Sequence, residues 1–231
     1  VYASPEDPVK LVRLRVENRT DVPRRLTATQ YVEWVLGTVP GITRRYLVPA
    51  FDAETACLTV RNPYHMELGE PTAFMAASRP LNGYTADRAA FLGVGGSLAR
   101  PAALGTVGLQ PRVAPGGDVC GALQVHLDLA PHTSDELHFV IGQGRDADHA
   151  AELAQRYRHP EAARAAWEDT QRYWDDLLGR IQVRTPEPAI NPMLNRWLLY
   201  QSLSCRLHGR SAFYQSSGAY GFRDQLQDSL A

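Results

Sequence analysis

The chain has 231 residues, 44% of them hydrophobic, which is enough for one large domain or two small ones. Its 24 basic and 25 acidic side chains give a formal net charge of -1, and the basic residues are dispersed. This excludes the clustered positive charge that nucleic acids select. The sequence has no apolar run long enough for a membrane span and no secretory signal, so we expect no direct membrane contact from this segment.

The cysteines and histidines do not form a recognisable ligand pattern. Cys57, Cys120 and Cys205 are an odd number without CxxC or Cys/His spacing, which argues against a disulfide framework and against zinc. The seven histidines lack an HExxH motif, so we expect no metal site. A reducing compartment is expected.

Both ends of the sequence predict a piece of a longer polypeptide. The chain starts without Met and stops at Ala231 inside an expected helix, with no capping or stop signal.

From Val9 to about Gly142 the hydrophobic pattern has period two. Val12, Leu14 and Val16 alternate with charged residues, as in a half-buried strand. The expected strands are 9–18, 26–36, 46–51, 56–60, 122–130 and 137–141. Many short strands separated by Gly, Pro, Asn and Asp, with no interleaved helices, predict an antiparallel β-sandwich.

After Gly144 the pattern changes to the helical period. A short amphipathic helix is expected at 147–158, and a second one starts at Pro160, with Trp167, Trp174, Leu178 and Ile181 on one stripe. Gly179 and the RTPEP run end this helix.

The last helix is expected at 188–208, with apolar residues on more than one face. Such a helix is usually enclosed by other helices.

The run at 211–228, SAFYQSSGAYGFRDQLQD, combines aromatic, amide and charged side chains. Sugar sites use this mixture, because aromatic faces cover the C–H face of a pyranose and polar groups bond its hydroxyls. Asp224 and Asp228 lie four residues apart on one helix face, and Arg223 and Gln227 are the local candidates to compensate their charge. The alternative is that these charges only tie the helix to its neighbours. Tyr220 and Phe222 are candidate sugar contacts, although such residues are more often core residues than ligand contacts.

At this point the chain resembles glycoside hydrolase family 94, a family consisting mainly of phosphorylases. The similarity is carried by 195–228 and, in the sandwich, by VEWVLG at 32–37, ADRAAFLG at 86–93 and GGDVCGALQ at 116–124. Within that family, the sequence YQSSGAYGFRDQLQD is most similar to the cyclic β-1,2-glucan synthase branch.

The resemblance implies an α+β multidomain fold. A β-sandwich would occupy 1–143, a helical linker 144–186, and the beginning of a truncated (α/α)6 catalytic barrel 187–231. The Arg and Asp that bind the nonreducing-end glucosyl unit would be Arg223 and Asp228, with Asp224 and Gln227 in support. The catalytic general acid and the phosphate-binding residues would lie beyond Ala231, so no catalytic residue is expected in this fragment.

The implied reaction is inverting phosphorolysis of β-glucosidic bonds, or its reverse, with inorganic phosphate as co-substrate and no metal or organic cofactor. Because phosphate arrives as an anionic nucleophile, one general acid suffices. The partners would be a β-linked gluco-oligosaccharide or glucan and phosphate, and no nucleic acid. The choice between a monomer and a homodimer is left open. The implied location is cytoplasmic, or the cytoplasmic face of the inner membrane for a glucan synthase.

Two other functions remain open at this stage: a non-catalytic carbohydrate-binding module and an inverting glycoside hydrolase. Asp87 and Arg88, in a loop-like stretch, could rim the substrate cleft or form a structural pair. Tyr64, Trp34 and Tyr84 could form a sugar platform, although Trp34 lies on the same alternating face as Leu36 and is better assigned to the core.

Overall fold

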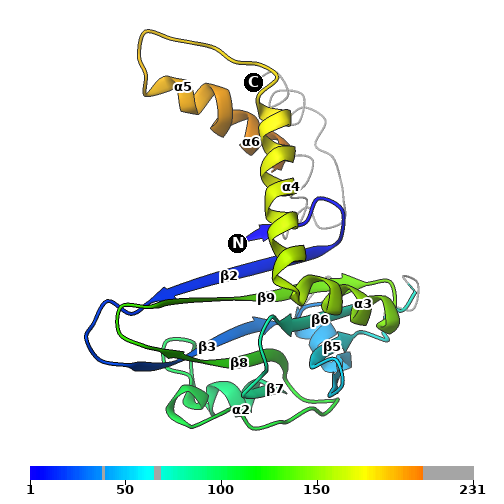
Figure 1. Cartoon of the computed structure of the whole chain (residues 1–231). Helices are drawn as coiled ribbons and strands as arrows, with labels where there is room; N and C mark the ends of the chain where they lie inside the picture. Colours follow the sequence, from blue (N-terminus) through cyan, green and yellow to red (C-terminus); the bar gives the residue numbers. More distant parts are fainter. Residues whose placement is uncertain (38–39, 65–68, 205–231) are drawn as a thin grey trace. The chain divides into compact units, whose positions relative to one another are not determined.

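The computed structural model describes residues 1–37, 40–64 and 69–204. The chain divides into two compact units, Val1–Trp167 and Glu168–Ala231. The first contains two antiparallel β-sheets, and the described part of the second is helical (Figure 1). The expected domain boundaries at 143 and 186 stay predictions.

The larger sheet contains six strands. In spatial order they are β1 (Tyr2–Ala3), β2 (Val9–Glu17), β9 (Ser134–Gly144), β6 (Thr72–Ala77), β5 (Cys57–Arg61) and β4 (Val48–Asp52). Every neighbouring pair is antiparallel. The short strand β1 and the five-residue strand β4 therefore form its edges.

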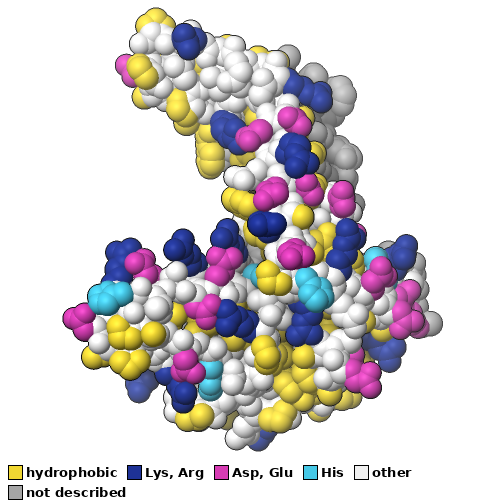
Figure 2. Space-filling model, viewed as in Figure 1, with side chains coloured by type: hydrophobic (Ala, Val, Ile, Leu, Met, Phe, Trp, Pro, Cys, Tyr) yellow, Lys and Arg dark blue, Asp and Glu magenta, His cyan; other side chains and the backbone are white. Residues whose placement is uncertain are grey.

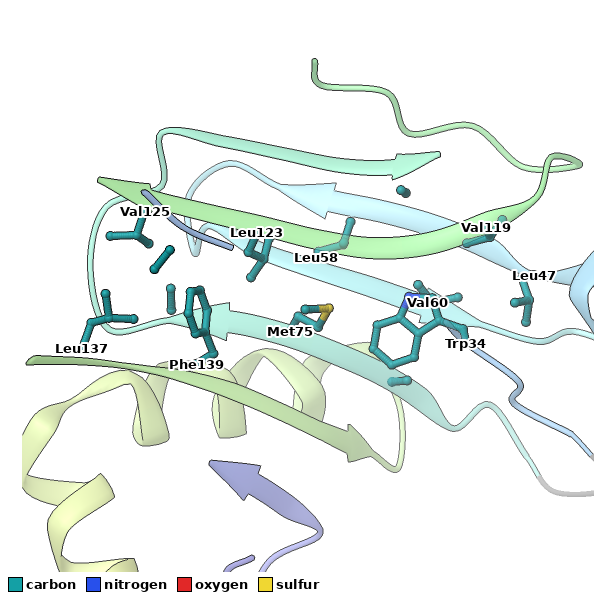
Figure 3. Packing of buried hydrophobic residues seen from close by; sticks show 14 of the residues in the cluster. Trp34, Leu47, Leu58, Val60, Met75, Val119, Leu123, Val125, Leu137 and Phe139 are labelled. Carbon is teal, nitrogen blue, oxygen red and sulfur yellow. The ribbon is translucent and has the colours of Figure 1, made fainter. Parts of the chain in front are cut away.

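The smaller sheet contains three strands, in the order β3 (Arg24–Glu33), β8 (Val119–Leu129) and β7 (Gly83–Asp87), also antiparallel. The two sheets face each other and enclose the main hydrophobic core, into which the side chains of Trp34, Met75, Leu123 and Phe139 point (Figure 3). The expected antiparallel β-sandwich is confirmed.

Helices cover the other face of the larger sheet. The helix α3 (Ala147–Arg158) and the start of α4 (Pro160–Leu178) pack there around Phe74, which is fully buried. The connection from β9 into α3 is tight: a Cβ on Gly144 would lie 2.3 Å from the backbone nitrogen of Ala150. Glycine is required where a helix returns this closely to its strand.

Each of these two helices starts as its sequence predicts. The Asp146 carboxylate accepts a hydrogen bond of 2.8 Å from the His149 backbone N–H, which caps α3. The helix ends before Pro160, which disfavours helical geometry in the preceding residue but suits the first turn of α4. Tyr2 secures the start of α4, because its hydroxyl donates 2.6 Å to the Ala163 carbonyl.

The outer face of the smaller sheet is covered as well. The short helix α2 (Arg88–Leu92) and the 3₁₀ turn η3 (Ala102–Gly105) bury Phe91, Leu92 and Leu109 against Cys120 and Ala122. Gln124, on the same strand β8, is 2% exposed.

The described part of the second unit is built around the C-terminal part of α4 and a second helical segment. That segment comprises α5 (Ile190–Pro192), the π-helical turn η4 (Met193–Trp197) and α6 (Leu198–Leu203). The chain between α4 and α5 is held to this segment by the Asn195 side chain, which forms hydrogen bonds of 2.7 and 2.8 Å with the Val183 backbone. Arg196 pairs with Asp175 at 2.6 Å.

Three expectations about the elements are wrong. The strands β1, β6 and β7 were not expected. The strand β6 was missed because it is buried on both sides and shows no alternation. Short helices do occur between the strands, namely α1 (Pro40–Thr43), η1 (Arg44–Tyr46), α2 and η3. Ile181 does not continue the α4 stripe, since the helix ends at Leu178 and Ile181 is 68% exposed.

Candidate functional site

The residues expected to bind glucose lie outside the described residues. They are Tyr220, Phe222, Arg223, Asp224, Gln227 and Asp228. Their roles stay predictions, and the functional geometry that can be described is that of the sandwich.

Four charged side chains lie in contact at one end of the smaller sheet. They are Glu33, Arg44, Arg88 and Asp118, and we call them the ion cluster. Arg44 lies 3.1 Å from Glu33 and 3.3 Å from Asp118. Arg88 lies 2.9 Å from Glu33 and 3.2 Å from Asp118. Each guanidinium thus contacts both carboxylates, and each carboxylate contacts both guanidinium groups.

The strand order explains why these residues meet. Glu33 is the last residue of β3, Asp118 directly precedes β8, and Arg88 directly follows β7. The register pairs Glu33 with Cys120 and Asp87 with Val119, so the three strand ends lie side by side. The sequence segments 32–37, 86–93 and 116–124 each contribute one member, and η1 supplies Arg44.

The electrostatics of the ion cluster favour a structural role over proton transfer. The hydrogen bond from Arg88 lowers the pKa of Glu33, and Glu33 in turn raises the pKa of Arg88. Glu33 is therefore a carboxylate at neutral pH and cannot act as a general acid. Tyr31 donates a 3.0 Å hydrogen bond to it, and burial raises the pKa of that phenol.

Asp87 and Arg88 each have their own partners and do not form a pair with one another. The Asp87 carboxylate caps α2 by accepting bonds of 2.8 and 3.1 Å from the backbone nitrogens of Ala89 and Ala90. Its second oxygen lies 3.7 Å from Arg112. The expected loop is therefore a strand end followed by a helix, and a structural role accounts for both residues.

The three aromatic residues considered as a sugar platform do not come together. Trp34 is 7% exposed and belongs to the core, as expected, although β3 ends at Glu33 and no strand continues from Trp34 to Leu36. Tyr84 stacks on Phe51 against the same core, with ring centroids 3.5 Å apart. Tyr64 instead stacks on Tyr46, which sequence reasoning did not single out.

The two cysteines in the described ranges are buried and free, on opposite sides of the sandwich. Cys57 lies beneath the α3 layer and Cys120 beneath the α2 layer. Burial raises the pKa of each thiol to about 12, so neither is a reactive thiolate at neutral pH. Among residues 1–37, 40–64 and 69–204, no cluster of His, Cys, Asp and Glu could hold a metal ion.

Charge on the visible face is mixed, with basic and acidic side chains interspersed over both units (Figure 2). Within the described ranges, no helix has the length and apolar character needed to cross a bilayer.

Comparison with known proteins identifies the family. The glycosyl hydrolase 94 supersandwich domain matches residues 1–160, which include both sheets and α3. The chain belongs to the glycosyl hydrolase 94 family. The catalytic domain of the glycosyl hydrolase 94 superfamily matches residues 173–231.

Individual members of the glycosyl hydrolase 94 family align along nearly the whole chain. The cyclic beta-(1,2)-glucan synthase NdvB of Rhizobium meliloti is 39% identical over 97% of this chain and 8% of its own length. The N,N'-diacetylchitobiose phosphorylase of Vibrio furnissii is 25% identical over 94% of this chain and 28% of its own length. The solabiose phosphorylase of Paenibacillus borealis is 27% identical over 100% of this chain and 30% of its own length. The chain thus spans less than a third of these relatives.

Proposed function

We propose that the chain is a fragment of a glycoside phosphorylase that acts on β-glucans, as in the region of a cyclic β-1,2-glucan synthase that controls chain length. The observation that carries this proposal is the catalytic-domain match over 173–231, because it includes the run RDQLQD at 223–228. The relatives include phosphorylases of several β-linked sugars as well as a glucan synthase.

In this proposal, Arg223 and Asp228 bind the nonreducing-end glucosyl unit. A guanidinium and a carboxylate can each make two directional, charge-assisted bonds to vicinal hydroxyls. Asp224 and Gln227 orient these groups, and Tyr220 and Phe222 supply apolar surface for the sugar ring.

The proposed reaction is an inverting displacement at the anomeric carbon. Phosphate attacks that carbon from the face opposite the leaving group, while an aspartic acid elsewhere in the polypeptide protonates the glycosidic oxygen. The products are α-glucose 1-phosphate and the shortened saccharide. No metal or organic cofactor takes part, because phosphate is itself the nucleophile.

The second unit is proposed to be the beginning of an (α/α)6 barrel. Trp197 is 50% exposed and Leu198 36% exposed among the described residues, although both lie on the apolar stripe of their helix. Further barrel helices would cover these side chains. Because the proposed general acid lies elsewhere in the polypeptide, we expect the 231-residue chain alone to be inactive.

The proposed partners are a β-linked gluco-oligosaccharide or glucan and inorganic phosphate, and a homodimer by analogy with related phosphorylases. The proposed location is cytoplasmic, or the cytoplasmic face of the inner membrane if the polypeptide is a cyclic glucan synthase.

The test is an assay of the complete polypeptide on β-1,2- and β-1,4-linked glucans, with and without phosphate. We expect phosphate-dependent release of α-glucose 1-phosphate. Release of free glucose without phosphate would instead indicate an inverting hydrolase, and glucan binding without turnover would indicate a binding module. Glucose 1-phosphate production by the 231 residues alone would contradict the expected inactivity.

A further inference from the structure

Two tyrosines form an exposed aromatic stack at one end of the β4–β5 hairpin. The rings of Tyr46 and Tyr64 have centroids 4.4 Å apart and an interplanar angle of 17°. Tyr46 is 43% exposed and Tyr64 55% exposed. The other aromatic pairs of the described first unit pack against its hydrophobic clusters, so core packing does not account for this one.

The hairpin register brings the two rings together. Val48 pairs with Arg61 at the end of the ladder. Tyr46 precedes this pair by two residues and Tyr64 follows it by three, so both lie just beyond the same ladder end. The strand β4 is the edge strand of the six-stranded sheet, so among the described residues no strand pairs with its outer side.

The position of Tyr64 is fixed by Asn62. The Asn62 carboxamide oxygen accepts 3.1 Å from the Tyr64 backbone nitrogen, and its amide donates 2.6 Å to the Leu36 carbonyl. A side chain that bonds its own backbone two residues on holds a turn in shape. These two hydrogen bonds therefore fix the backbone from which the Tyr64 side chain extends.

A hollow of about 300 Å³ adjoins this turn. It is lined by Arg61, Asn62, Pro63, Gly69, Glu70 and Pro71. Arg61 and Glu70 are exposed, and neither forms an ion pair with another described residue. Ligand sites begin at about this volume and combine apolar surface with a few polar groups.

We propose that Tyr46, Tyr64 and the adjoining hollow form a surface site for a β-linked glucan chain. The exposed aromatic surface covers the C–H face of a glucosyl unit, and Arg61 and Glu70 bond hydroxyls of the neighbouring unit. Both signs of charge line the hollow, which suits a neutral ligand rich in hydroxyl donors and acceptors. This inference rests on the proposed function for the identity of the polymer, but it places binding on the sandwich, away from Arg223 and Asp228 in sequence.

The experiment measures retention of the 231-residue chain by linear β-1,2-glucan in affinity electrophoresis. Tyr64→Ala and Arg61→Ala are each expected to weaken retention about tenfold, while Tyr173→Ala, on a tyrosine 39% exposed in the second unit, leaves it unchanged. Unchanged thermal unfolding of each variant separates lost binding from lost folding. Tyr64→Phe keeps the ring and should retain the glucan.

A second arm separates this inference from the proposed function. The loss of retention caused by Tyr64→Ala should be the same in the Arg223→Ala background as in the wild-type chain. Retention that is lost in Arg223→Ala but kept in Tyr64→Ala would overturn the surface site and leave the proposed function standing. Retention that depends on Tyr64, in a complete polypeptide without phosphorolysis, would support the surface site and overturn the proposed function.

Two further outcomes overturn the inference. One is the absence of any retention of the wild-type chain. The other is self-association in sedimentation that Tyr64→Ala abolishes while glucan retention is unchanged, because the tyrosines would then form a contact between two copies of the chain.

Discussion

The sandwich and the described helical part of the second unit differ in how far their apolar side chains are exposed to solvent. In Val1–Trp167 the larger sheet has the smaller sheet on one face and helices on the other, and side chains such as Phe74 and Leu123 are fully buried. In the second unit Met193 is 46% exposed and Trp197 50% exposed. Hydrophobic periodicity shows which face of an element is apolar, but only the neighbouring elements decide whether that face is buried.

The largest expected effect tests this contrast directly with two aromatic-to-alanine substitutions. Phe74→Ala should destabilise the chain by about 3–5 kcal/mol, because it opens a cavity in a closed core. Trp197→Ala should cost about 1 kcal/mol or less in the 231-residue chain, where the indole is half exposed. Urea unfolding of both variants measures the difference.

The same experiment has a matched control and an extension. Leu26→Ala, on a sandwich side chain 40% exposed, should cost no more than Trp197→Ala. In the complete polypeptide the cost of Trp197→Ala should rise if barrel helices cover it. Equal costs for Phe74→Ala and Trp197→Ala in the 231-residue chain would break the contrast.

The next prediction concerns activity. Arg223→Ala or Asp228→Ala in the complete enzyme should lower kcat/KM for phosphorolysis by about 100-fold or more, since charge-assisted bonds to the sugar are lost. Arg172→Ala, which removes an exposed ion pair of 3.0 Å with Asp169, is the arginine control and should leave the rate unchanged. Near-normal kinetics of both site variants would remove these residues from the substrate site.

A smaller effect is expected at the ion cluster, where the charge supports structure. Glu33→Gln keeps the shape but leaves two guanidinium groups sharing one carboxylate, and should cost about 1–2 kcal/mol of stability. Chemical denaturation should show this loss, and kcat of the complete enzyme should not change. Glu17→Gln, on an exposed pair with Arg19, should have no measurable effect on stability. A large loss of kcat in Glu33→Gln with normal stability would assign the cluster to catalysis.

The smallest effect is a pH dependence confined to the sandwich. His138 is 5% exposed, and its Nε2–H donates 2.9 Å to the Tyr157 carbonyl. Burial is the main cause that lowers the pKa of His138, with a nearby positive charge from Arg13 acting in the same direction and the Tyr157 bond and Glu136 opposing. The unfolded chain therefore binds a proton more readily than the folded one.

The free energy of unfolding is therefore unaffected by His138 protonation well above its ordinary pKa of 6.5, and it decreases as the pH drops below that value. At one pH unit below that value the loss is at most about 1.4 kcal/mol. His138→Gln can still donate to the carbonyl and should remove this part of the pH dependence between pH 7 and 5.5. Parallel stability profiles of the two proteins would show that His138 does not titrate with folding.

The sequence predicted the sandwich well where strands alternate and poorly where they are buried on both faces. The strand β2 shows alternation because part of it faces solvent, whereas β6 is a continuous apolar run that periodicity cannot distinguish from a short buried helix.

The candidate site was predictable in part. Trp34 was correctly expected in the core, but β3 ends at Glu33, so a strand alternation with Leu36 is not what buries it. The ion cluster could not be predicted, because it depends on three strand ends that are far apart in sequence and become neighbours only through the order β3-β8-β7. Nor does spacing alone indicate that Tyr64 would meet Tyr46, which needs the β4–β5 register. The roles of Arg223 and Asp228 stay predictions.

The edge strand β4 contains Pro49, paired with Val60 in the ladder. A proline has no backbone N–H, so at this position the exposed edge cannot offer a full row of donors to a strand from another molecule. At the opposite edge β1 pairs only with Lys10 and Leu11, and the remainder of β2 carries the charged residues Arg13, Arg15 and Glu17, which disfavour an added strand. These two features should protect the six-stranded sheet from edge-to-edge aggregation while the polypeptide is being synthesised.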